Sequence, residues 1–314
     1  MNIIATIFAL VVAVPLLLIG AMVAATWEPD RPLAQLKARW APPPSDFVQV
    51  QGMSVHLRDE GPRGDPVPIV LLHGTSSSLH TWEGWAEAFK AERRVIRFDL
   101  PGIGLTGPAP DADYRIERYV RFVAAMLDQL GVARCVLAGN SFGGQVAWET
   151  ALAHPARVDR LVLVDAAGYP FQPLSIPLGF RIARMPLLKR LMEHTLPRRV
   201  IEASLHNVYA DRGKVTPQLV QRYFELTLRA GNRRALAQRF AQAPEGIHPE
   251  RIAALKTPTL ILWGGRDRLL PPGDTQKFHR DIAGSRLIVF EQLGHVPQEE
   301  DPASTAAAVK QFLS

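Results

Sequence analysis

Short apolar runs alternate with amphipathic stretches from residue 47 onward, and this alternation predicts a sheet covered by helices. Eight runs rich in Val, Ile and Leu are expected to be strands, at residues 47–50, 54–59, 68–72, 94–99, 135–138, 160–165, 259–263 and 286–290. Helical spacing fills intervals such as 116–130, 145–153 and 303–312. The first two runs predict an antiparallel hairpin, and the later runs predict a mostly parallel eight-stranded sheet with helices on both faces.

One interval between two predicted strands is too long for a simple crossover connection. Residues 169–257 contain several prolines and then show helical periodicity through 180–192, 199–209, 217–230 and 234–241. A structureless loop of that length is uncommon inside a folded domain. We therefore expect a helical cap at 169–257, inserted between a first core segment at 46–168 and a second at 258–314.

The first 27 residues differ in pattern from the rest of the chain. No residue from Ile3 to Thr26 is charged, and at about 1.5 Å per residue this stretch would reach roughly 35 Å, enough to cross a hydrocarbon core of about 30 Å. Trp27 follows where an interfacial aromatic residue is expected. We predict a single-pass transmembrane helix at residues 1–27 that anchors the protein in a membrane, with a cleaved secretory signal ending near residues 23–25 as the alternative.

The charges that follow this segment suggest an orientation. Arg31, Lys37 and Arg39 come after it and only the α-amino group precedes it, a bias that slightly favours a cytoplasmic position for the folded domain. A cleaved signal would instead give a secreted or periplasmic protein. Residues 28–45 contain three consecutive prolines at 42–44, so we expect this segment to form a stiff linker.

Composition narrows the class of protein. Hydrophobic residues make up 47% of the 314 residues and charged residues 21%, as in an ordinary folded chain. The net charge of +6 would suit an anionic partner, but no zinc-finger spacing, RNA-binding aromatic motif or concentrated basic run accompanies it, so we expect no nucleic-acid partner. The single cysteine, Cys135, excludes an intrachain disulfide and is expected to be a buried, unreactive thiol.

Residues 139–143, Gly-Asn-Ser-Phe-Gly, lie between a predicted strand and a predicted helix. A sharp turn there would push the Ser141 hydroxyl out of the sheet, and the glycines on either side would let strand and helix approach closely. This pattern predicts Ser141 as a nucleophile. A glycine-rich turn with an ordinary exposed serine would carry the same residues, so the prediction depends on partners elsewhere in the chain.

Two later loops supply an acid and a base. Asp267 follows the strand predicted at 259–263, and His295 follows the last predicted strand. A carboxylate can accept a hydrogen bond from an imidazole Nδ1–H, fix its tautomer and stabilise the imidazolium. The chain order Ser, Asp, His suits a nucleophile at a strand–helix turn. We predict Ser141, Asp267 and His295 as a catalytic triad, with Asp165 as the alternative acid.

The reaction also needs backbone N–H groups directed at the carbonyl oxygen as it becomes an oxyanion, each contributing about 3–4 kcal/mol to lowering the barrier. Phe142 follows the nucleophile, and Thr75 lies just after the strand predicted at 68–72. We predict the N–H groups of Thr75 and Phe142 as the oxyanion hole. His73, two residues before Thr75, is expected to be a structural residue of that loop.

Together these motifs resemble the α/β-hydrolase superfamily from about residue 46 to the C-terminus. The resemblance rests on His73-Gly74, on the turn at 99–104, on the turn around Ser141, and on the loops of Asp267 and His295. It implies an α/β-hydrolase fold with the triad and the roles given above. Similar haloalkane dehalogenases and epoxide hydrolases carry an aspartate as the nucleophile, so Ser141 favours acyl chemistry.

The predicted mechanism passes through an acyl-enzyme that His295 then helps water to hydrolyse. We expect no metal and no organic cofactor, because no cluster of ligand residues is visible in the sequence. The expected partner is a small molecule, a lipophilic carboxylic ester, which a membrane anchor would bring close, and the expected enzyme is a carboxylesterase or lipase.

Two alternatives to an esterase remain. Residues 139–144 are also similar to those of meta-cleavage product hydrolases, which split carbon–carbon bonds in ring-fission products. A ligand-binding protein that has lost its chemistry is the other alternative, although no triad member is missing. The substrate-binding residues and the oligomeric state are not predictable from the sequence. Four basic cap residues would either meet an acidic substrate or form a solvated helix face, namely Arg181, Arg184, Lys189 and Arg190.

Overall fold

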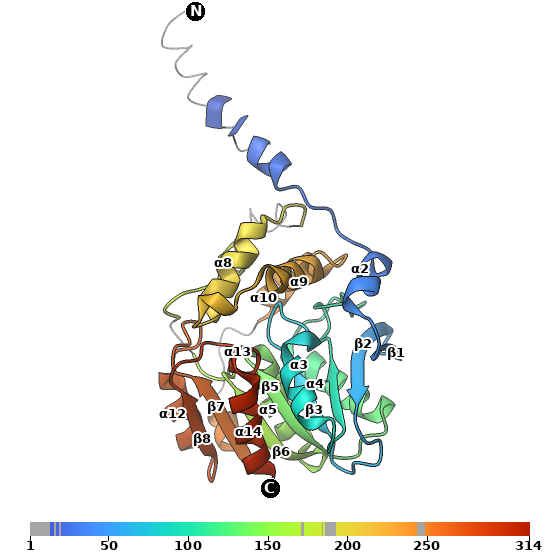
Figure 1. Ribbon diagram of the computed structural model, residues 1–314, viewed down its shortest axis with the longest axis vertical. Coiled ribbons are helices and arrows are strands. Elements are labelled where there is room, and N and C mark those ends of the chain that lie inside the picture. The colour runs from blue at the N-terminus through green and yellow to red at the C-terminus, as the bar shows by residue number, and fades with distance from the viewer. Residues whose placement is uncertain are drawn as a thin grey trace, which may run out of the picture.

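A single eight-stranded sheet runs through the molecule in the order β1-β2-β4-β3-β5-β6-β7-β8 (Figure 1). The computed structural model describes residues 13–15, 17–18, 20–170, 173–183, 185, 193–243 and 249–314. The strands are β1 (Ser45–Val50), β2 (Met53–Glu60), β3 (Ile69–Leu72), β4 (Val95–Phe98), β5 (Cys135–Asn140), β6 (Val158–Val164), β7 (Thr259–Gly264) and β8 (Arg286–Phe290). Every predicted strand is present within a few residues of its expected bounds, which confirms the sheet.

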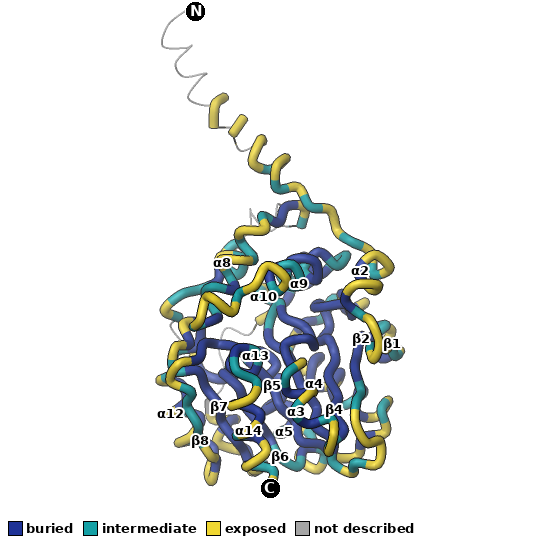
Figure 2. Tube along the Cα trace, in the orientation of Figure 1, coloured by how far each residue is buried: buried dark blue, intermediate teal, exposed yellow. Residues whose placement is uncertain are grey.

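The pairing of the strands follows the predicted pattern. β1 and β2 form the antiparallel hairpin, β2 pairs antiparallel with β4, and all later pairs are parallel. Every residue of β3, β4, β5 and β7 is buried. Both faces of these strands are therefore covered, as their continuous apolar sequences require, and Figure 2 shows the buried strands at the centre of the molecule.

Two hydrophobic clusters cover the two faces of the sheet, and neighbouring residues of one strand belong to different clusters. In β3, Val70 and Leu72 join the cluster of α4 (Ile116–Gln129), α5 (Phe142–Ala153) and α12 (Gly273–Asp281). Ile69 and Leu71 join the cluster of α3 (Glu83–Phe89) and α14 (Pro302–Leu313). The alternation of side chains along a strand thus produces three layers, helix, sheet and helix.

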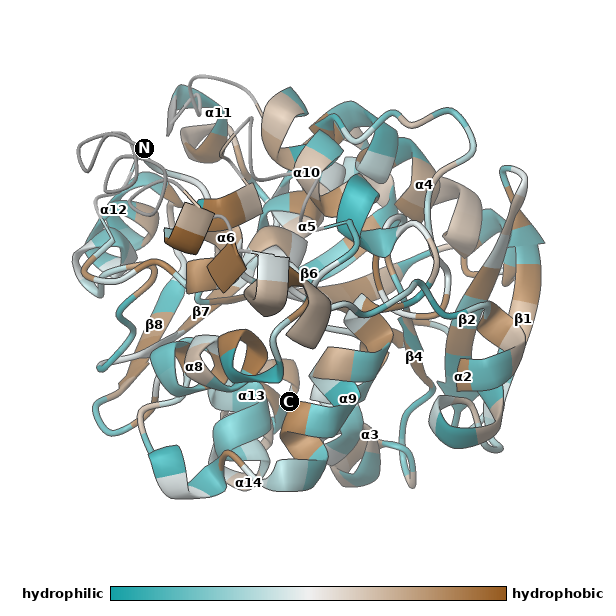
Figure 3. Cartoon of the chain, turned by 90° about the horizontal axis from the view of Figure 1, so that it is seen from above, coloured by the Kyte–Doolittle hydropathy of each residue, from teal (hydrophilic) through white to brown (hydrophobic). Residues whose placement is uncertain are grey.

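The chain between β6 and β7 forms helices, most of which lie over one end of the sheet (Figure 1). They are α6 (Leu178–Ala183), α8 (Arg198–Val208), α9 (Pro217–Thr227), α10 (Asn232–Gln242) and α11 (Pro249–Ala253). Seen from above, α6, α8, α9 and α10 lie around the middle of the molecule (Figure 3). The helix predicted at 180–192 overlaps the end of α6, and residues 184 and 186–192 lie outside the described residues.

Part of the segment predicted as a linker is folded. Residues 33–40 form α2 (Leu33–Trp40), and the side chains of Leu36 and Trp40 are buried against Leu105 and Leu226. The indole Nε1 of Trp40 also donates to Glu225 at 2.6 Å. The linker prediction was wrong here because the prolines follow the helix instead of extending through the segment.

The predicted membrane anchor is also corrected. Within the part of the chain that the structure describes, no helix is both long enough and apolar enough to cross a membrane. The described helical turns near the N-terminus fall within residues 13–25, at most about 20 Å of helix against a hydrocarbon core of about 30 Å. This finding overturns the predicted transmembrane helix at 1–27 and the localisation that depended on it. Residues 1–12, 16 and 19 of that prediction lie outside the described residues.

Candidate active site

Ser141 lies in the turn between the end of β5 and the start of α5. Its backbone angles are φ 55° and ψ −118°, a region that residues other than glycine rarely adopt. Its N–H donates to Val164 of the neighbouring strand at 3.0 Å, and its carbonyl accepts from Gln145 at 3.1 Å. Strand and helix hold both sides of the turn, which explains how such a strained conformation is maintained.

The glycines on either side of Ser141 are required by close packing. A Cβ atom on Gly139 would lie 2.2 Å from the carbonyl oxygen of Gly143, and one on Gly143 would lie 2.3 Å from the carbonyl oxygen of Leu72. Neither contact leaves room for a methyl group, and both neighbours are backbone atoms. The glycine spacing therefore reflects the close approach of α5 to β3 and β5 that the sequence predicted.

The structure brings Asp267 and His295 together. His295 Nδ1 lies 2.6 Å from Asp267 Oδ2, and both side chains are buried. The other oxygen of Asp267 accepts from the N–H groups of Leu269 at 2.7 Å and Leu270 at 3.0 Å. In the neutral tautomer whose Nδ1–H donates to this carboxylate, Nε2 carries no hydrogen and can accept a proton from a hydroxyl.

Asn140 and Gly74 connect this pair with the serine. The side-chain amide of Asn140 donates to the carbonyl of His295 at 3.0 Å and to that of Val164 at 3.1 Å. A Cβ atom on Gly74 would lie 3.2 Å from the Cβ of Ser141, so the 73–75 loop lies directly against the serine. Sequence reasoning gave Asn140 no role, although it lies within the serine motif.

The two residues predicted to form the oxyanion hole flank one arginine. Phe142 is the first residue of α5, so its N–H has no partner within the helix. Thr75 Oγ1 accepts from Arg239 Nη2 at 2.9 Å, and the guanidinium carbon of Arg239 lies 4.3 Å from the centre of the Phe142 ring. Arg239 lies on α10, and nothing in the sequence connects it with residues 75 and 142.

His73 is a structural residue of the loop that carries Thr75. Its Nδ1–H donates to the carbonyl of Gly74 at 2.8 Å, and its Nε2 accepts from the N–H of Leu100 at 3.0 Å. Burial lowers the pKa of His73, which keeps the ring neutral in agreement with this pattern of donor and acceptor. The loop is thus tied to the turn after β4.

A carboxylate near the end of the chain holds the loop of His295. Glu300 Oε2 accepts from the N–H of Gly294 at 2.8 Å, and Glu300 Oε1 accepts from that of Asp211 at 2.8 Å. The N–H of His295 itself donates to the carbonyl of Val208, at the end of α8, at 2.8 Å. The chain after α8 and the His295 loop therefore share hydrogen bonds, a connection that the sequence did not reveal.

Three buried groups at this site have the chemistry of metal ligands. Ligand atoms of Asp165, Asp267 and His295 all lie within 4.8 Å of one another. A metal ion bound by all three would compete for atoms that already make the hydrogen bond of 2.6 Å between Asp267 and His295. We interpret the cluster as a hydrogen-bonded group instead of a metal site.

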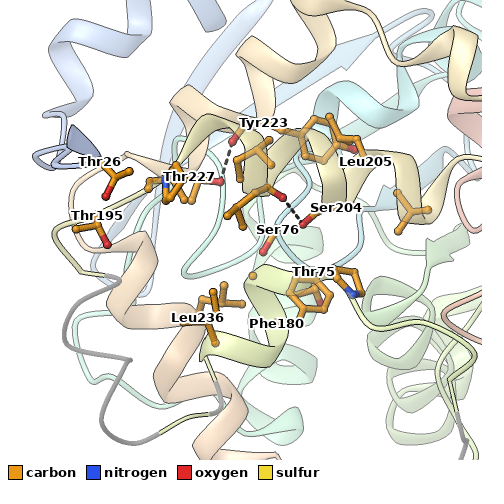
Figure 4. Close-up of a pocket in the computed structure, with 18 of the residues that line it drawn as sticks. Thr26, Thr75, Ser76, Phe180, Thr195, Ser204, Leu205, Tyr223, Thr227 and Leu236 are labelled. Carbon is orange, nitrogen blue, oxygen red and sulfur yellow. Dashed lines mark hydrogen bonds between the residues drawn. The ribbon is translucent and has the colours of Figure 1, made fainter. Parts of the chain in front are cut away.

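A cavity of about 330 Å³ opens beside the Thr75 loop (Figure 4). Its lining comes from that loop, from α6, α8, α9 and α10, and from the N-terminal segment, with Met22, Thr26, Ser76, Phe180, Tyr223 and Leu236 among the side chains. None of the described residues that line it is charged. Of the four basic cap residues, Arg181 is exposed and is not part of this lining, and Arg184, Lys189 and Arg190 lie outside the described residues.

The strand order and the serine turn are those of an α/β hydrolase. Residues 67–302 match the family model for the α/β-hydrolase fold, and the chain belongs to this family, which confirms the resemblance found in the sequence. A 2-hydroxymuconate semialdehyde hydrolase from Pseudomonas putida is 30% identical over 275 residues, which cover 85% of this chain and 93% of that protein.

Solved structures give two further similarities. A meta-cleavage product hydrolase from Pseudomonas fluorescens IP01 has a TM-score of 0.74 and 25% identity, covering 85% of this chain and 97% of its own. A membrane phospholipase A, described as a bacterial virulence factor, has a TM-score of 0.72 and 25% identity, covering 99% of this chain and 97% of its own. The chain is a hydrolase, and the 2-hydroxymuconate semialdehyde hydrolase and the meta-cleavage product hydrolase favour the carbon–carbon bond alternative over the ester interpretation.

Proposed function

We propose that this chain hydrolyses a carbon–carbon bond in an acidic, conjugated diketone, with Ser141 as nucleophile, His295 as general base and Asp267 as the acid that orients it. The observation that carries this proposal is the buried hydrogen bond of 2.6 Å between His295 and Asp267, in a loop that Asn140 attaches to the serine turn. This arrangement supports a proton transfer from hydroxyl to imidazole.

The proposed reaction has two halves. Ser141 Oγ adds to the ketone carbonyl as His295 Nε2 takes its proton, and the N–H groups of Thr75 and Phe142 stabilise the oxyanion. The carbon–carbon bond then breaks, the leaving carbanion takes the proton that His295 holds, and an acyl group remains on Ser141. His295 next removes a proton from water, which attacks the acyl-enzyme and releases a carboxylic acid.

The substrate class is supported by the named relatives. The similarity to a 2-hydroxymuconate semialdehyde hydrolase covers most of both chains, and a 2-hydroxy-6-oxo-2,4-heptadienoate hydrolase from Pseudomonas putida is 29% identical over 281 residues. Both names describe acids with an oxo group further along the chain. Arg239, beside Thr75 and Phe142, supplies a positive charge that suits such a carboxylate.

Esters with an apolar chain are the second candidate. The uncharged cavity that begins at Thr75 suits a hydrocarbon chain better than a second carboxylate. The likeness to a phospholipase A supports the same class. The two candidates use the same three residues and differ in the group that leaves Ser141.

A substrate comparison on the full chain separates them. The test substrates are a 2-hydroxy-6-oxo-dienoic acid and p-nitrophenyl esters of graded acyl length. Faster turnover of the dienoic acid, with release of a carboxylic acid, is the expected result. Ester turnover alone would overturn the carbon–carbon proposal in favour of the second candidate.

Two variants test the residue roles in the same assay. Ser141→Ala should lose nearly all turnover with either substrate, and Asp267→Asn should lower kcat by roughly 10⁴-fold, because an amide leaves the imidazole in the wrong tautomer. Circular dichroism should show both variants folded. Full activity of Ser141→Ala would contradict the proposed nucleophile.

A further inference from the structure

Asp165 is a completely buried carboxyl group just beyond the end of β6. Its backbone has φ 42°, a conformation that residues other than glycine rarely adopt. Its N–H donates to the carbonyl of Leu262 at 3.0 Å, and its Oδ1 accepts from the N–H of Gly264 at 3.1 Å. The second oxygen, Oδ2, receives no hydrogen bond from a donor among the described residues.

The acid partner of His295 lies next to this group. One side-chain oxygen of Asp165, one of Asp267 and one ring nitrogen of His295 all lie within 4.8 Å of one another, so the two buried carboxyl groups are close neighbours. A hydrogen bond between two carboxyl groups needs a proton on one of them, since two carboxylates have no donor. Two negative charges side by side in a buried site would also repel each other strongly.

The contacts indicate which group holds the proton. Asp267 accepts three hydrogen bonds, from Leu269, Leu270 and His295, and each stabilises its charged form. Asp165 accepts only one backbone hydrogen bond among the described residues. Burial raises the pKa of Asp165 well above its usual value, and the neighbouring charges of Asp267 and Glu300 raise it further.

We propose that Asp165 carries a proton and donates it to Asp267, and so acts as a positioning residue for the acid of the triad. The inference rests on the proposed function. Neutral Asp165 leaves a single negative charge beside the imidazole. Its O–H occupies a lone pair of Asp267, so that carboxylate is held from both sides and cannot rotate away from His295 Nδ1.

Two substitutions separate this role from simple packing. Asp165→Asn keeps an acceptor for the N–H of Gly264 and puts an N–H donor toward Asp267, without a charge. Asp165→Ala removes both interactions. The matched control is Asp159→Asn at the other end of β6, where Asp159 pairs with Arg134. Circular dichroism and thermal unfolding establish that each variant is folded.

The first measurement is independent of activity. Infrared spectra of the wild-type protein at neutral pH should contain the C=O stretching band of a buried protonated carboxylic acid. This band should be absent from Asp165→Asn and present in Asp159→Asn. A wild-type spectrum without the band, or the same band in Asp165→Asn, would overturn the proposal.

The second measurement is the rate of inactivation by a fluorophosphonate probe as a function of pH. The acidic limb of this pH profile reports protonation of the proposed base, His295. Asp165→Asn should leave the midpoint of this limb unchanged, because it replaces one neutral group with another. If Asp165 were ionised, losing its charge would move the midpoint to lower pH by roughly one unit or more. That shift would overturn the proposal.

Asp165→Ala should react roughly 10- to 100-fold more slowly than the wild-type protein, by analogy with metal sites, where removing a hydrogen-bond partner that orients a ligating side chain has an effect of this size. Asp165→Asn should restore most of that rate. Equal losses in both variants would contradict a donor role. Failure of the proposed function can be distinguished from failure of this proposal. Reaction of the probe with Ser141→Ala would reject the triad, but it would leave the infrared result for Asp165 unaffected.

Discussion

The guanidinium of Arg239 contacts both halves of the proposed oxyanion hole. It donates to the hydroxyl of Thr75 at 2.9 Å and lies 4.3 Å from the centre of the Phe142 ring. Only 9% of Arg239 is exposed, so its charge is weakly screened by solvent. A carboxylate bound beside the reacting carbonyl would feel this charge, whereas a neutral ester would not.

Arg239→Gln should therefore discriminate between the two substrate classes. We expect KM for the 2-hydroxy-6-oxo-dienoic acid to rise about 10- to 100-fold, because a hydrogen bond to a charged group contributes about 1.5–3 kcal/mol. Turnover of p-nitrophenyl butyrate should change little. Steady-state kinetics on both substrates provide the measurement.

Arg234→Gln is the control for this prediction. Arg234 lies on the same helix, but 68% of its side chain is exposed, and it pairs with Glu193. Its replacement should leave both substrates unaffected. Equal losses on both substrates in Arg239→Gln would mean that the arginine only holds the Thr75 loop in place, and the carboxylate role would be abandoned.

Among individual residues, the sequence allowed prediction of those that come directly after the end of a predicted strand. Ser141, Asp267 and His295 were predicted because each follows a recognisable apolar run, in the expected chain order. Arg239 and Glu300 were missed because they lie in helical segments with no motif, and only the folded chain brings them to the site. Residues that act through tertiary contacts leave no local pattern.

At the scale of elements, Glu300 joins the chain after α8 to the loop of His295. Its two oxygens accept three backbone hydrogen bonds, from Ala210, Asp211 and Gly294. Gly294 directly precedes the proposed base. The position of the imidazole therefore depends on the segment after α8, which is distant along the chain because Asp211 and Glu300 are 89 residues apart.

Glu300→Gln should weaken this connection. In this variant the side-chain NH2 of glutamine would face at least one backbone N–H that now donates to a carboxylate oxygen, and two donors cannot form a hydrogen bond. We therefore expect the free energy of unfolding to fall by about 1.5–3 kcal/mol. We also expect a lower kcat, because the His295 loop loses a constraint. Urea unfolding and steady-state kinetics of the same preparation measure both effects.

The exposed Glu92 gives a matched control, and Glu92→Gln should change neither stability nor kcat. A Glu300→Gln protein with lower stability and normal kcat would show that the contact supports the fold without positioning the base. Unchanged stability would contradict the prediction altogether.

The elements themselves were predictable to different degrees. The strands β3, β4, β5 and β7 were found because they are buried on both faces and apolar along almost their whole length, and β1 and β2 were found as a hairpin. The helix α2 was missed, although Leu33, Leu36 and Trp40 lie at helical spacing, because the prolines after it directed attention to a linker. The cavity could not be predicted, because its walls come from four helices, a loop and the N-terminal segment that meet only in the folded molecule.

At the scale of the whole molecule, His80 lies where three parts of the fold meet. Its Nε2–H donates to the carbonyl of Trp40 in α2 at 2.9 Å, and its ring lies 5.8 Å from that of His56 in β2. Burial, assisted by the charge of Arg222 on α9, lowers the pKa of His80 to about 3. A proton on His80 would place a charge between the sheet, α2 and the helices above the sheet.

This shift predicts a loss of stability in acid. Between about pH 6.5 and pH 3 the unfolded chain binds a proton at His80 and the folded protein does not, so the free energy of unfolding falls as the pH falls. The shift from 6.5 to about 3 corresponds to a loss of about 4–5 kcal/mol over this window. The pKa of Asp99 is lowered as well, but its contribution is lost only below about pH 3.8.

Urea unfolding at several pH values between 4 and 7 measures the slope, and His80→Gln identifies its source. Glutamine can still donate to the carbonyl of Trp40 but does not titrate, so the variant should lose less stability on acidification. At pH 7 the variant should be less stable than the wild-type protein. His73 is also buried with a lowered pKa and titrates in the same direction, so some slope should remain in the variant. Parallel curves for the two proteins would show that His80 does not control acid stability, and that the junction between α2 and the sheet accommodates its charge.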